Sequence, residues 1–382
     1  MKVNGNTMLA AILLLCVTAC RDEDARLVTT INDDGTCCRE YIFHSSPEGL
    51  MTPPEDSLKE QFLWVGPEWE RTWTVEGDTT HHPVPITEEE YYSYTDRAKA
   101  IGKQPRDLIM LHVKRQFDSV EEMSKTFYHW DEVVATSELE KQFKWFYTDY
   151  TFTETFKNNR SDILRLPITD FMAADTASYW CTGRPDLSQD CNGAELKEML
   201  DGIEVKVSQW FNANLMDRVC SRIAESYDEI PNPPMSKEQF EERCQTLVRL
   251  PRVINHSYLD DLNGEGIKQD IDAYFHTDAF TTFPSYQKVV DRSIQDYIHG
   301  YSFYFTSLFM NYELVMPGTI IDAGTGRAVN DTVHYRLSSE RLLPHPYVIT
   351  ATSRRVNIWA FIVTALVILL AIGSFAYRRK QG

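Results

Sequence analysis

The sequence predicts an α+β fold: a mixed or antiparallel sheet built from the N- and C-terminal parts, a helical middle segment, and one C-terminal transmembrane helix. Segments rich in β-branched and aromatic residues occur in the first 160 residues and again after residue 300. Between them, apolar residues repeat at helical spacing from Asn192 to about Ile230. The stretch from Ile358 to Tyr377 contains twenty residues without a charge, which predicts a membrane-spanning helix.

These observations divide the 382 residues into six segments. We expect a lipoprotein signal peptide at 1–19, an N-terminal β-rich part of an extracytoplasmic domain at 20–190, a helical segment at 191–299, a C-terminal β part at 300–355, a transmembrane helix at 356–377 and a cytoplasmic tail at 378–382. About 335 residues remain between the two ends, which is enough for one large domain or two of ordinary size.

The N-terminus has the features of a bacterial lipoprotein signal. An apolar run from Met8 to Val17 follows the basic Lys2 and is too short to cross about 30 Å of hydrocarbon. The run ends in Val17-Thr18-Ala19-Cys20, which resembles the lipobox, where small residues precede a cysteine that receives lipid. We therefore expect lipidation of Cys20. The alternative is an ordinary signal peptide that is cut nearby and leaves Cys20 as a thiol.

The first half of the extracytoplasmic part predicts strands with short helices. Leu27 to His44 is a hairpin whose Asp-Gly pair suits a tight turn. Glu88 to Lys99 is a short helix, and Asp107 to Phe117 is a strand. A second short helix follows that strand and is capped by Ser119. Alternating Thr, Tyr and Phe from Phe143 to Lys157 predict one long strand.

The middle of the chain predicts helices. Asn192 or Gly193 caps the helix that extends to about Ile230. Ser236 and Gln239 have the spacing of a capping box, so they begin the second arm of an antiparallel helix pair. The remaining predicted elements are helices at Gly266–Phe275 and Ser285–Ile298, and strands within 301–318, around Val333–Tyr335 and at Tyr347–Thr352.

The C-terminal span fixes an expected topology. Trp359 and Tyr377 lie where interfacial aromatic residues belong, and Arg378-Arg379-Lys380 follows at once. The positive-inside rule then puts the C-terminus in the cytoplasm and the large domain outside it. A helix of this kind is retained in the inner, cytoplasmic membrane, so we expect a single-pass protein facing the periplasm. The alternative is that the acidic Asp22-Glu23-Asp24 after Cys20 is a sorting signal for the outer membrane or cell surface.

The cysteine count agrees with export. Of eight cysteines, Cys16 leaves with the signal and Cys20 takes lipid, so an even number, six, remains. Cys181 and Cys191 flank a Gly-Pro-Asp turn that can bring them within disulfide distance.

Cys220 and Cys244 make a second predicted disulfide. They lie twelve residues either side of Asn232, so in an antiparallel helix pair they occupy one level. Cys37 and Cys38 point to opposite faces of a strand, and their pairing stays open. The alternative for all six is buried free thiols; a zinc site is disfavoured because no CxxC or paired-His spacing is present.

Composition excludes some classes of partner. The chain has 56 acidic against 38 basic side chains and a net charge of −18, which argues against nucleic acid and against docking on anionic lipid. We expect no cofactor and no catalytic residue, because neither GxSxG nor a recognisable nucleophile context occurs. His81-His82 lacks the spacing of zinc ligands, and Asp322 to Gly326 reads as a hairpin turn, since no lysine follows its glycines.

One weak calcium candidate is present. Asp261, Asn263, Glu265 and Asp272 follow the spacing of a calcium-binding loop. Lys268 replaces an aliphatic residue, and the last ligand is Asp where a bidentate Glu is usual. A glycine-rich turn between helices is the better interpretation, so we expect no metal.

A C-terminal segment of about sixty residues resembles a known family. Tyr312 to Ala323, with its Pro-Gly, then Asn330 to Tyr335 and the membrane helix, resemble the end of LppM-like membrane-anchored bacterial lipoproteins. That resemblance implies a sheet-and-helix domain that holds a lipid or apolar ligand. Tyr335 stands where a tryptophan is common, and the helical middle has no counterpart.

Two functions of different class remain. The first is a noncatalytic envelope protein that binds a ligand or a partner protein at the membrane. The second is an extracytoplasmic hydrolase acting on envelope glycan or lipid, suggested by the acidity and by the 12% aromatic content. An apolar pocket favours the first, and two carboxylates about 5–10 Å apart in an aromatic-lined groove favour the second.

Overall fold

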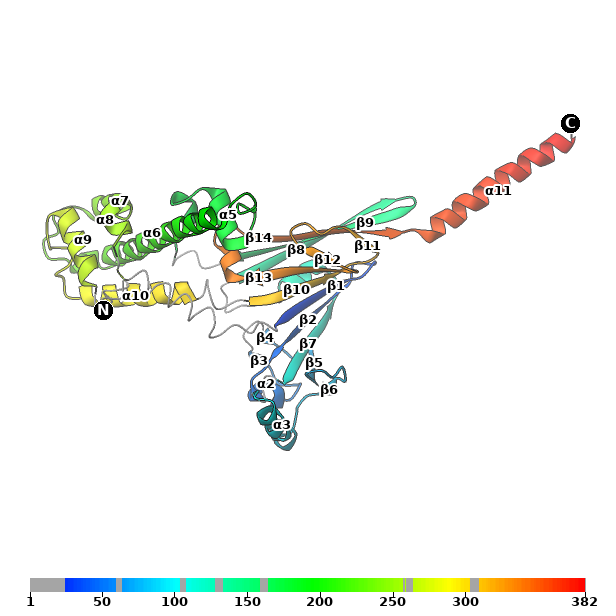
Figure 1. Ribbon diagram of the computed structural model, residues 1–382, viewed down its shortest axis with the longest axis horizontal. Coiled ribbons are helices and arrows are strands. Elements are labelled where there is room, and N and C mark those ends of the chain that lie inside the picture. The colour runs from blue at the N-terminus through cyan, green and yellow to red at the C-terminus, as the bar shows by residue number, and fades with distance from the viewer. Residues whose placement is uncertain are drawn as a thin grey trace. The chain divides into compact units, whose positions relative to one another are not determined.

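The predicted fold class is confirmed by the computed structural model, which combines helices with mixed and antiparallel sheets (Figure 1). The structure describes residues 25–59, 64–103, 108–127, 133–158, 164–256, 258, 264–302 and 309–381. These form two compact units. The β unit comprises 22–157, 309–337 and 347–382, and the helical unit comprises 158–308 and 338–346. The predicted signal peptide and Cys20 lie outside the described residues.

The larger sheet of the β unit joins the two ends of the chain. β1 (Arg26–Ile31) pairs in parallel with β10 (Phe309–Val315) and antiparallel with β2 (Cys37–His44). The predicted hairpin of residues 27–44 is therefore present, as is the sheet built from N- and C-terminal parts. The full strand order is β12 (Arg327–Val329), β13 (Thr332–Ser338), β10, β1, β2, β7 (Ile109–Phe117), β5 (Glu70–Val75) and β6 (His82–Pro83).

The second sheet has four strands in the order β11 (Thr319–Asp322), β14 (Tyr347–Val356), β9 (Tyr147–Asn158) and β8 (Val133–Lys144). The strand predicted from Phe143 to Lys157 is confirmed from Tyr147 onward as β9, but its start is wrong, because the chain turns at Trp145-Phe146 between β8 and β9. Neither turn residue is Gly, Asn or Asp, so the usual turn signal is missing.

The turn at Asp322 to Gly326 is also different from the prediction. It does not close a hairpin, because β11 pairs with β14 while β12 pairs with β13. The turn therefore passes the chain from one sheet to the other. Gly324 has φ +54°, and a Cβ there would lie 2.3 Å from the Thr350 carbonyl oxygen, so glycine is required at this crossing.

Short elements complete the β unit: α2 (Pro47–Met51), β3 (Leu58–Lys59), β4 (Trp64–Val65), α3 (Glu88–Ala100) and α4 (Val120–Ser124). The predicted helices are α3 and α4, and Ser119 caps α4 by accepting a hydrogen bond from the Glu122 amide.

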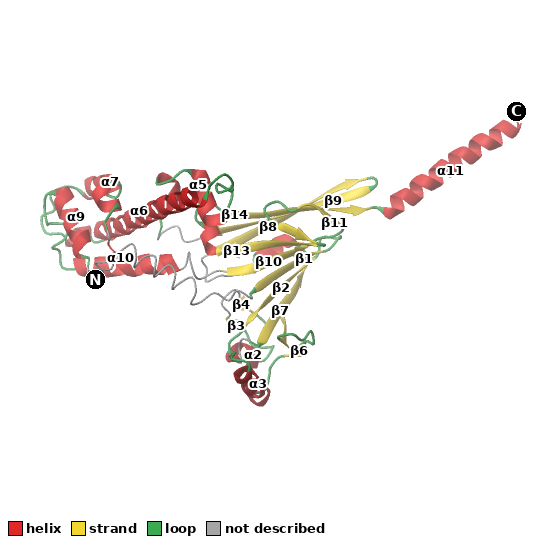
Figure 2. Cartoon of the chain, in the orientation of Figure 1, coloured by secondary structure: helices red, strands yellow, loops and turns green. Residues whose placement is uncertain are grey.

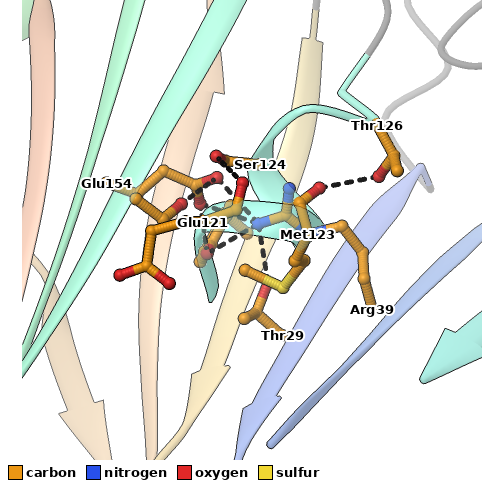
Figure 3. Close-up of polar contacts among 9 residues, drawn as sticks. Thr29, Arg39, Glu121, Met123, Ser124, Thr126 and Glu154 are labelled. Atoms are coloured by element: carbon orange, nitrogen blue, oxygen red, sulfur yellow. Dashed lines mark hydrogen bonds and ion pairs between the residues drawn. The ribbon is translucent and has the colours of Figure 1, made fainter. Parts of the chain in front are cut away.

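A buried ion pair joins the two sheets of the β unit (Figure 3). Arg39 comes from β2 and Glu154 from β9, and neither side chain is exposed to solvent. The Arg39 Nη2 donates to both carboxylate oxygens of Glu154 at 2.8 Å. Tyr312 of β10 and Ser137 of β8 donate their hydroxyls to the same carboxylate at 2.6 and 3.0 Å. Four strands therefore meet at one carboxylate.

The helical unit consists of α5 (Ala174–Thr182), α6 (Gly193–Glu225), α7 (Lys237–Leu247), α8 (Pro251–Ile254), α9 (Glu265–Phe275) and α10 (Tyr286–Ser302), shown in Figure 2. The predicted starts are confirmed: Asn192 caps α6 in a capping box with Glu195, and Ser236 pairs with Gln239 at the start of α7. α6 ends at Glu225 rather than near Ile230. A buried aromatic group packs between these helices; its rings include Tyr227, Phe240, Phe275 and Phe280.

The C-terminal helix α11 (Ile358–Gln381) has the length and composition of a membrane span. Its segment Ile358–Phe375 has a mean hydropathy of 2.6, and 6% of that segment is buried within the protein. Among the described residues it is the one helix that meets this description. An apolar surface so exposed is stable in lipid and unstable in water.

The Arg39–Glu154 pair generates a stability prediction. Arg39→Met leaves the Glu154 carboxylate buried without its cation, and we expect the free energy of unfolding to fall by about 3–5 kcal/mol. The measurement is urea unfolding of the full chain in detergent. Lys103→Met is the matched control, because it breaks an exposed pair with Glu76 and costs about 1 kcal/mol or less. Equal losses in the two variants would contradict the prediction. The double variant Arg39→Met/Glu154→Leu recovers most of the loss.

Candidate functional site

A cavity of about 420 Å³ lies in the helical unit between α6 and α7. The volume is in the range of small-molecule sites. Its lining is mostly charged or polar. The lining residues are Arg165, Asp217, Cys220, Ser221, Ala224, Glu225, Lys237, Glu241, Cys244 and Gln245.

Local sequence signals determine where the two helices that form this cavity lie in the chain. The capping boxes at Asn192 and Ser236 set where α6 and α7 begin. α6 ends at Glu225, and the chain then reverses through Pro231 to Pro234, where prolines exclude a helix and Asn232 has φ +49°. As a result, the last turns of α6 and the middle of α7 face each other across the cavity.

One wall of the cavity is an organised charge group. Arg165 Nε lies 3.2 Å from the Asp217 carboxylate, and its Nη1 donates to the Ser221 hydroxyl at 2.8 Å. Burial raises the pKa of Asp217, while Arg165 opposes that rise. The cations Arg165 and Lys237 and the anions Asp217, Glu225 and Glu241 line the same space. Such a lining suits a ligand that carries both donors and acceptors.

Cys220 and Cys244 form another part of the lining. Both are buried, and all six cysteines in the described residues are free thiols, so neither predicted disulfide is present in the structure. The neighbouring Cys244 thiol together with burial raises the pKa of Cys220 well above its ordinary value. Sequence symmetry about Asn232 therefore placed the two correctly side by side.

The other predicted pair is not joined. Cys181 is buried near the end of α5, and burial raises the pKa of its thiol to about 12. Cys191 instead donates a hydrogen bond from its Sγ to the Leu187 carbonyl at 3.5 Å.

The chain matches no protein-family model, no curated protein and no solved structure.

The weak calcium candidate is described only in part. Asp261 and Asn263 lie outside the described residues. Glu265 and Asp272 are seven residues apart on α9, about 10 Å along the helix axis. The Asp272 carboxylate accepts a hydrogen bond from Thr281 at 2.6 Å, and Glu265 accepts one from Gln269 at 3.3 Å. The described residues contain no group of three or more His, Cys, Asp or Glu side chains placed to hold a metal.

A polar cluster that sequence reasoning missed lies beside α9. Asp270, 2% exposed, accepts hydrogen bonds from Arg252 Nε and Tyr258 Oη, both at 2.6 Å. Its carboxylate also lies 3.0 Å from His256 Nδ1, and the His256 ring stacks on Tyr258. These contacts tie the segment after α8 to α9. In so acidic a chain, no spacing distinguishes Asp270 from other acidic residues.

The adjacent histidines at the edge of the β unit have partners of their own. His82 stacks on Trp73 with ring centroids 4.5 Å apart, and the ring of His81 lies within hydrogen-bond distance of Thr72. They complete the edge of the larger sheet.

Proposed function

We propose that this chain is a single-pass membrane protein of the bacterial envelope that binds a polar ligand or a partner protein outside the cytoplasm. The observation that carries the proposal is α11, an exposed apolar helix long enough to span a bilayer. The charged cavity between α6 and α7 supplies the binding site. The helix α11 tethers the chain that carries this site to the membrane.

Two features of the sequence support the topology and the second anchor. The lipobox-like Val17-Thr18-Ala19-Cys20 supports export and lipidation of Cys20, as in LppM-like lipoproteins. Arg378-Arg379-Lys380 after the span supports a cytoplasmic C-terminus, which places the protein in the inner membrane. Export of the N-terminus requires the same orientation.

The cavity favours a polar ligand over the apolar one that the LppM-like resemblance implies. Arg165 and Lys237 offer donors, and Asp217, Glu225 and Glu241 offer acceptors. A lipid tail would displace water from this lining without offering a hydrogen bond in its place, at a cost of about 1–3 kcal/mol for each polar group left unsatisfied.

The two anchors are tested by removing them singly and together. The full chain, the Cys20→Ala variant and a chain ending at Asn357 are each expected to stay in the membrane pellet after alkaline carbonate extraction. The variant that lacks both anchors is expected in the soluble fraction. Lipid labelling that persists in Cys20→Ala would refute lipidation, and release of the chain that lacks only α11 would show that Cys20 alone does not anchor.

The binding site is tested by thermal shift of the full chain in detergent, with envelope sugars, phospholipid head groups and short charged peptides as probes. We expect a probe that raises the melting temperature to bind about tenfold or more weakly to Arg165→Ala, because a charge-assisted hydrogen bond contributes about 1.5–3 kcal/mol. Arg97→Ala, an exposed arginine of the β unit, is the control. Hydrolysis of a glycan or lipid probe that Asp217→Asn abolishes would establish the hydrolase instead.

An oxidising compartment is expected to join Cys220 and Cys244, because both side chains line the same cavity between α6 and α7. Closing a loop of this length stabilises the folded state by about 3 kcal/mol. Mass spectrometry of the exported protein, digested without reductant, should recover the two peptides linked. The Cys181→Ser variant keeps this link and serves as the control. Recovery of Cys220 and Cys244 only as free thiols from exported protein would contradict the expectation.

A further inference from the structure

A single residue connects the β unit to its membrane helix. Asn357 lies between β14, which ends at Val356, and α11, which begins at Ile358. Its backbone amide donates to the Phe146 carbonyl at 2.9 Å. Its side-chain amide donates to the carbonyls of Lys144 and Trp145 at 3.0 and 3.4 Å. Asn357 therefore ties the turn of the β8–β9 hairpin to the start of α11.

The side chains of that turn continue the contact along α11. We call Phe143, Trp145 and Phe146 the aromatic tip. Phe143 and Trp145 both pack against Trp359, with ring centroids 6.2 and 5.4 Å apart. Phe146 contacts Phe361 at 4.7 Å.

The position of Trp145 shows how far along α11 the aromatic tip reaches. Its indole Nε1 donates to the Thr364 hydroxyl at 2.8 Å. Thr364 is six residues after Ile358, so it lies about 9 Å along the axis from the start of the apolar helix. When α11 crosses a bilayer, Trp145 cannot stay in bulk water, because the helix residue to which it is bonded is inside the apolar span.

The aromatic tip is also exposed within the protein. Phe143, Trp145 and Phe146 have exposed fractions of 60, 47 and 40%. Trp145 has a polar N–H on an apolar ring and is of the residue type most typical of the interface between lipid head groups and acyl chains, while Phe143 and Phe146 are wholly apolar. Contact with lipid would cover the surface that the protein leaves open.

The charged residues beside the tip are paired with one another. Arg354 donates to both oxygens of Asp149 at 2.7 and 3.0 Å, and Lys144 lies 3.3 Å from the same carboxylate. The Arg354 guanidinium also covers the ring of Tyr147. This succession of apolar tip, then aromatic ring, then paired charge follows the gradient of polarity across a membrane interface.

We propose that the aromatic tip inserts into the interfacial layer of the bilayer that α11 crosses, so that the β8–β9 hairpin is a second, peripheral membrane contact. The proposal rests on the proposed membrane span of α11. The partner of the aromatic tip is phospholipid. Zwitterionic lipid suffices, because the tip is aromatic and its neighbouring charges are paired.

The test is photocrosslinking of the full chain in phosphatidylcholine nanodiscs. A benzophenone amino acid replaces Phe146, and in separate samples Phe143, Leu366 or Tyr92. Leu366 lies inside the span, and Tyr92 is 61% exposed on α3 of the same unit. We expect lipid adducts from positions 143, 146 and 366, and at least tenfold less from position 92.

The outcomes separate the two proposals. Lipid adducts at 366 without adducts at 143 and 146 overturn the inserted tip and leave the span intact. The absence of adducts at 366 contradicts the span itself. Crosslinks from 143 or 146 to a second copy of the chain, in place of lipid, would identify a dimer contact and overturn the proposal.

Asn357→Ala tests the connection. Without its side-chain amide the β8–β9 hairpin loses three hydrogen bonds to Asn357, those to the Lys144 and Trp145 carbonyls and the one from the Thr148 hydroxyl. We expect lipid adducts from position 146 to fall at least twofold while those from 366 stay unchanged. Asn158→Ala, at the other end of β9, is the matched control. Equal adduct yields in Asn357→Ala and the control would show that Asn357 does not position the tip.

Discussion

The ion pair between Arg39 and Glu154 is the interaction on which the β unit depends. Two opposite charges removed from water are stable only with close geometry and further hydrogen bonds. Tyr312 and Ser137 supply those bonds to Glu154. These partners come from β2, β8, β9 and β10, so the pair forms only when all four strands are in register. A one-residue slip of β9 would turn Glu154 to the opposite face and leave Arg39 alone.

The same register sets the geometry at the membrane end. β9 and β14 pair from Glu154 opposite Ile349 to Tyr147 opposite Val356. Over those seven residues β9 advances about 23 Å, from the buried carboxylate to the β8–β9 turn. Because β14 is held along this whole length, Asn357 reaches the turn at the residue where the helix must start. A buried charge in the core thus determines where the chain leaves the sheet for α11.

Sequence signals located the features that depend on neighbouring residues. The Asp-Gly hairpin, the caps at Asn192 and Ser236 and the apolar span are all local patterns, and the structure contains each of them. The parallel pairing of β1 with β10 and the Arg39–Glu154 contact join residues far apart in the chain, and no spacing encodes them. The β8–β9 turn was missed for another reason. It consists of aromatic residues that contact α11, and such residues do not carry the usual turn signal.

The fold determines the positions of Cys220 and Cys244, whereas the surroundings of the protein determine their oxidation state. Helix caps and the Pro231–Pro234 reversal place α6 against α7, so the two thiols line one cavity whatever the compartment. Whether they become a disulfide depends on the redox potential outside the protein. The oxidation state of this pair therefore reports the compartment of the helical unit, independently of α11 and Cys20.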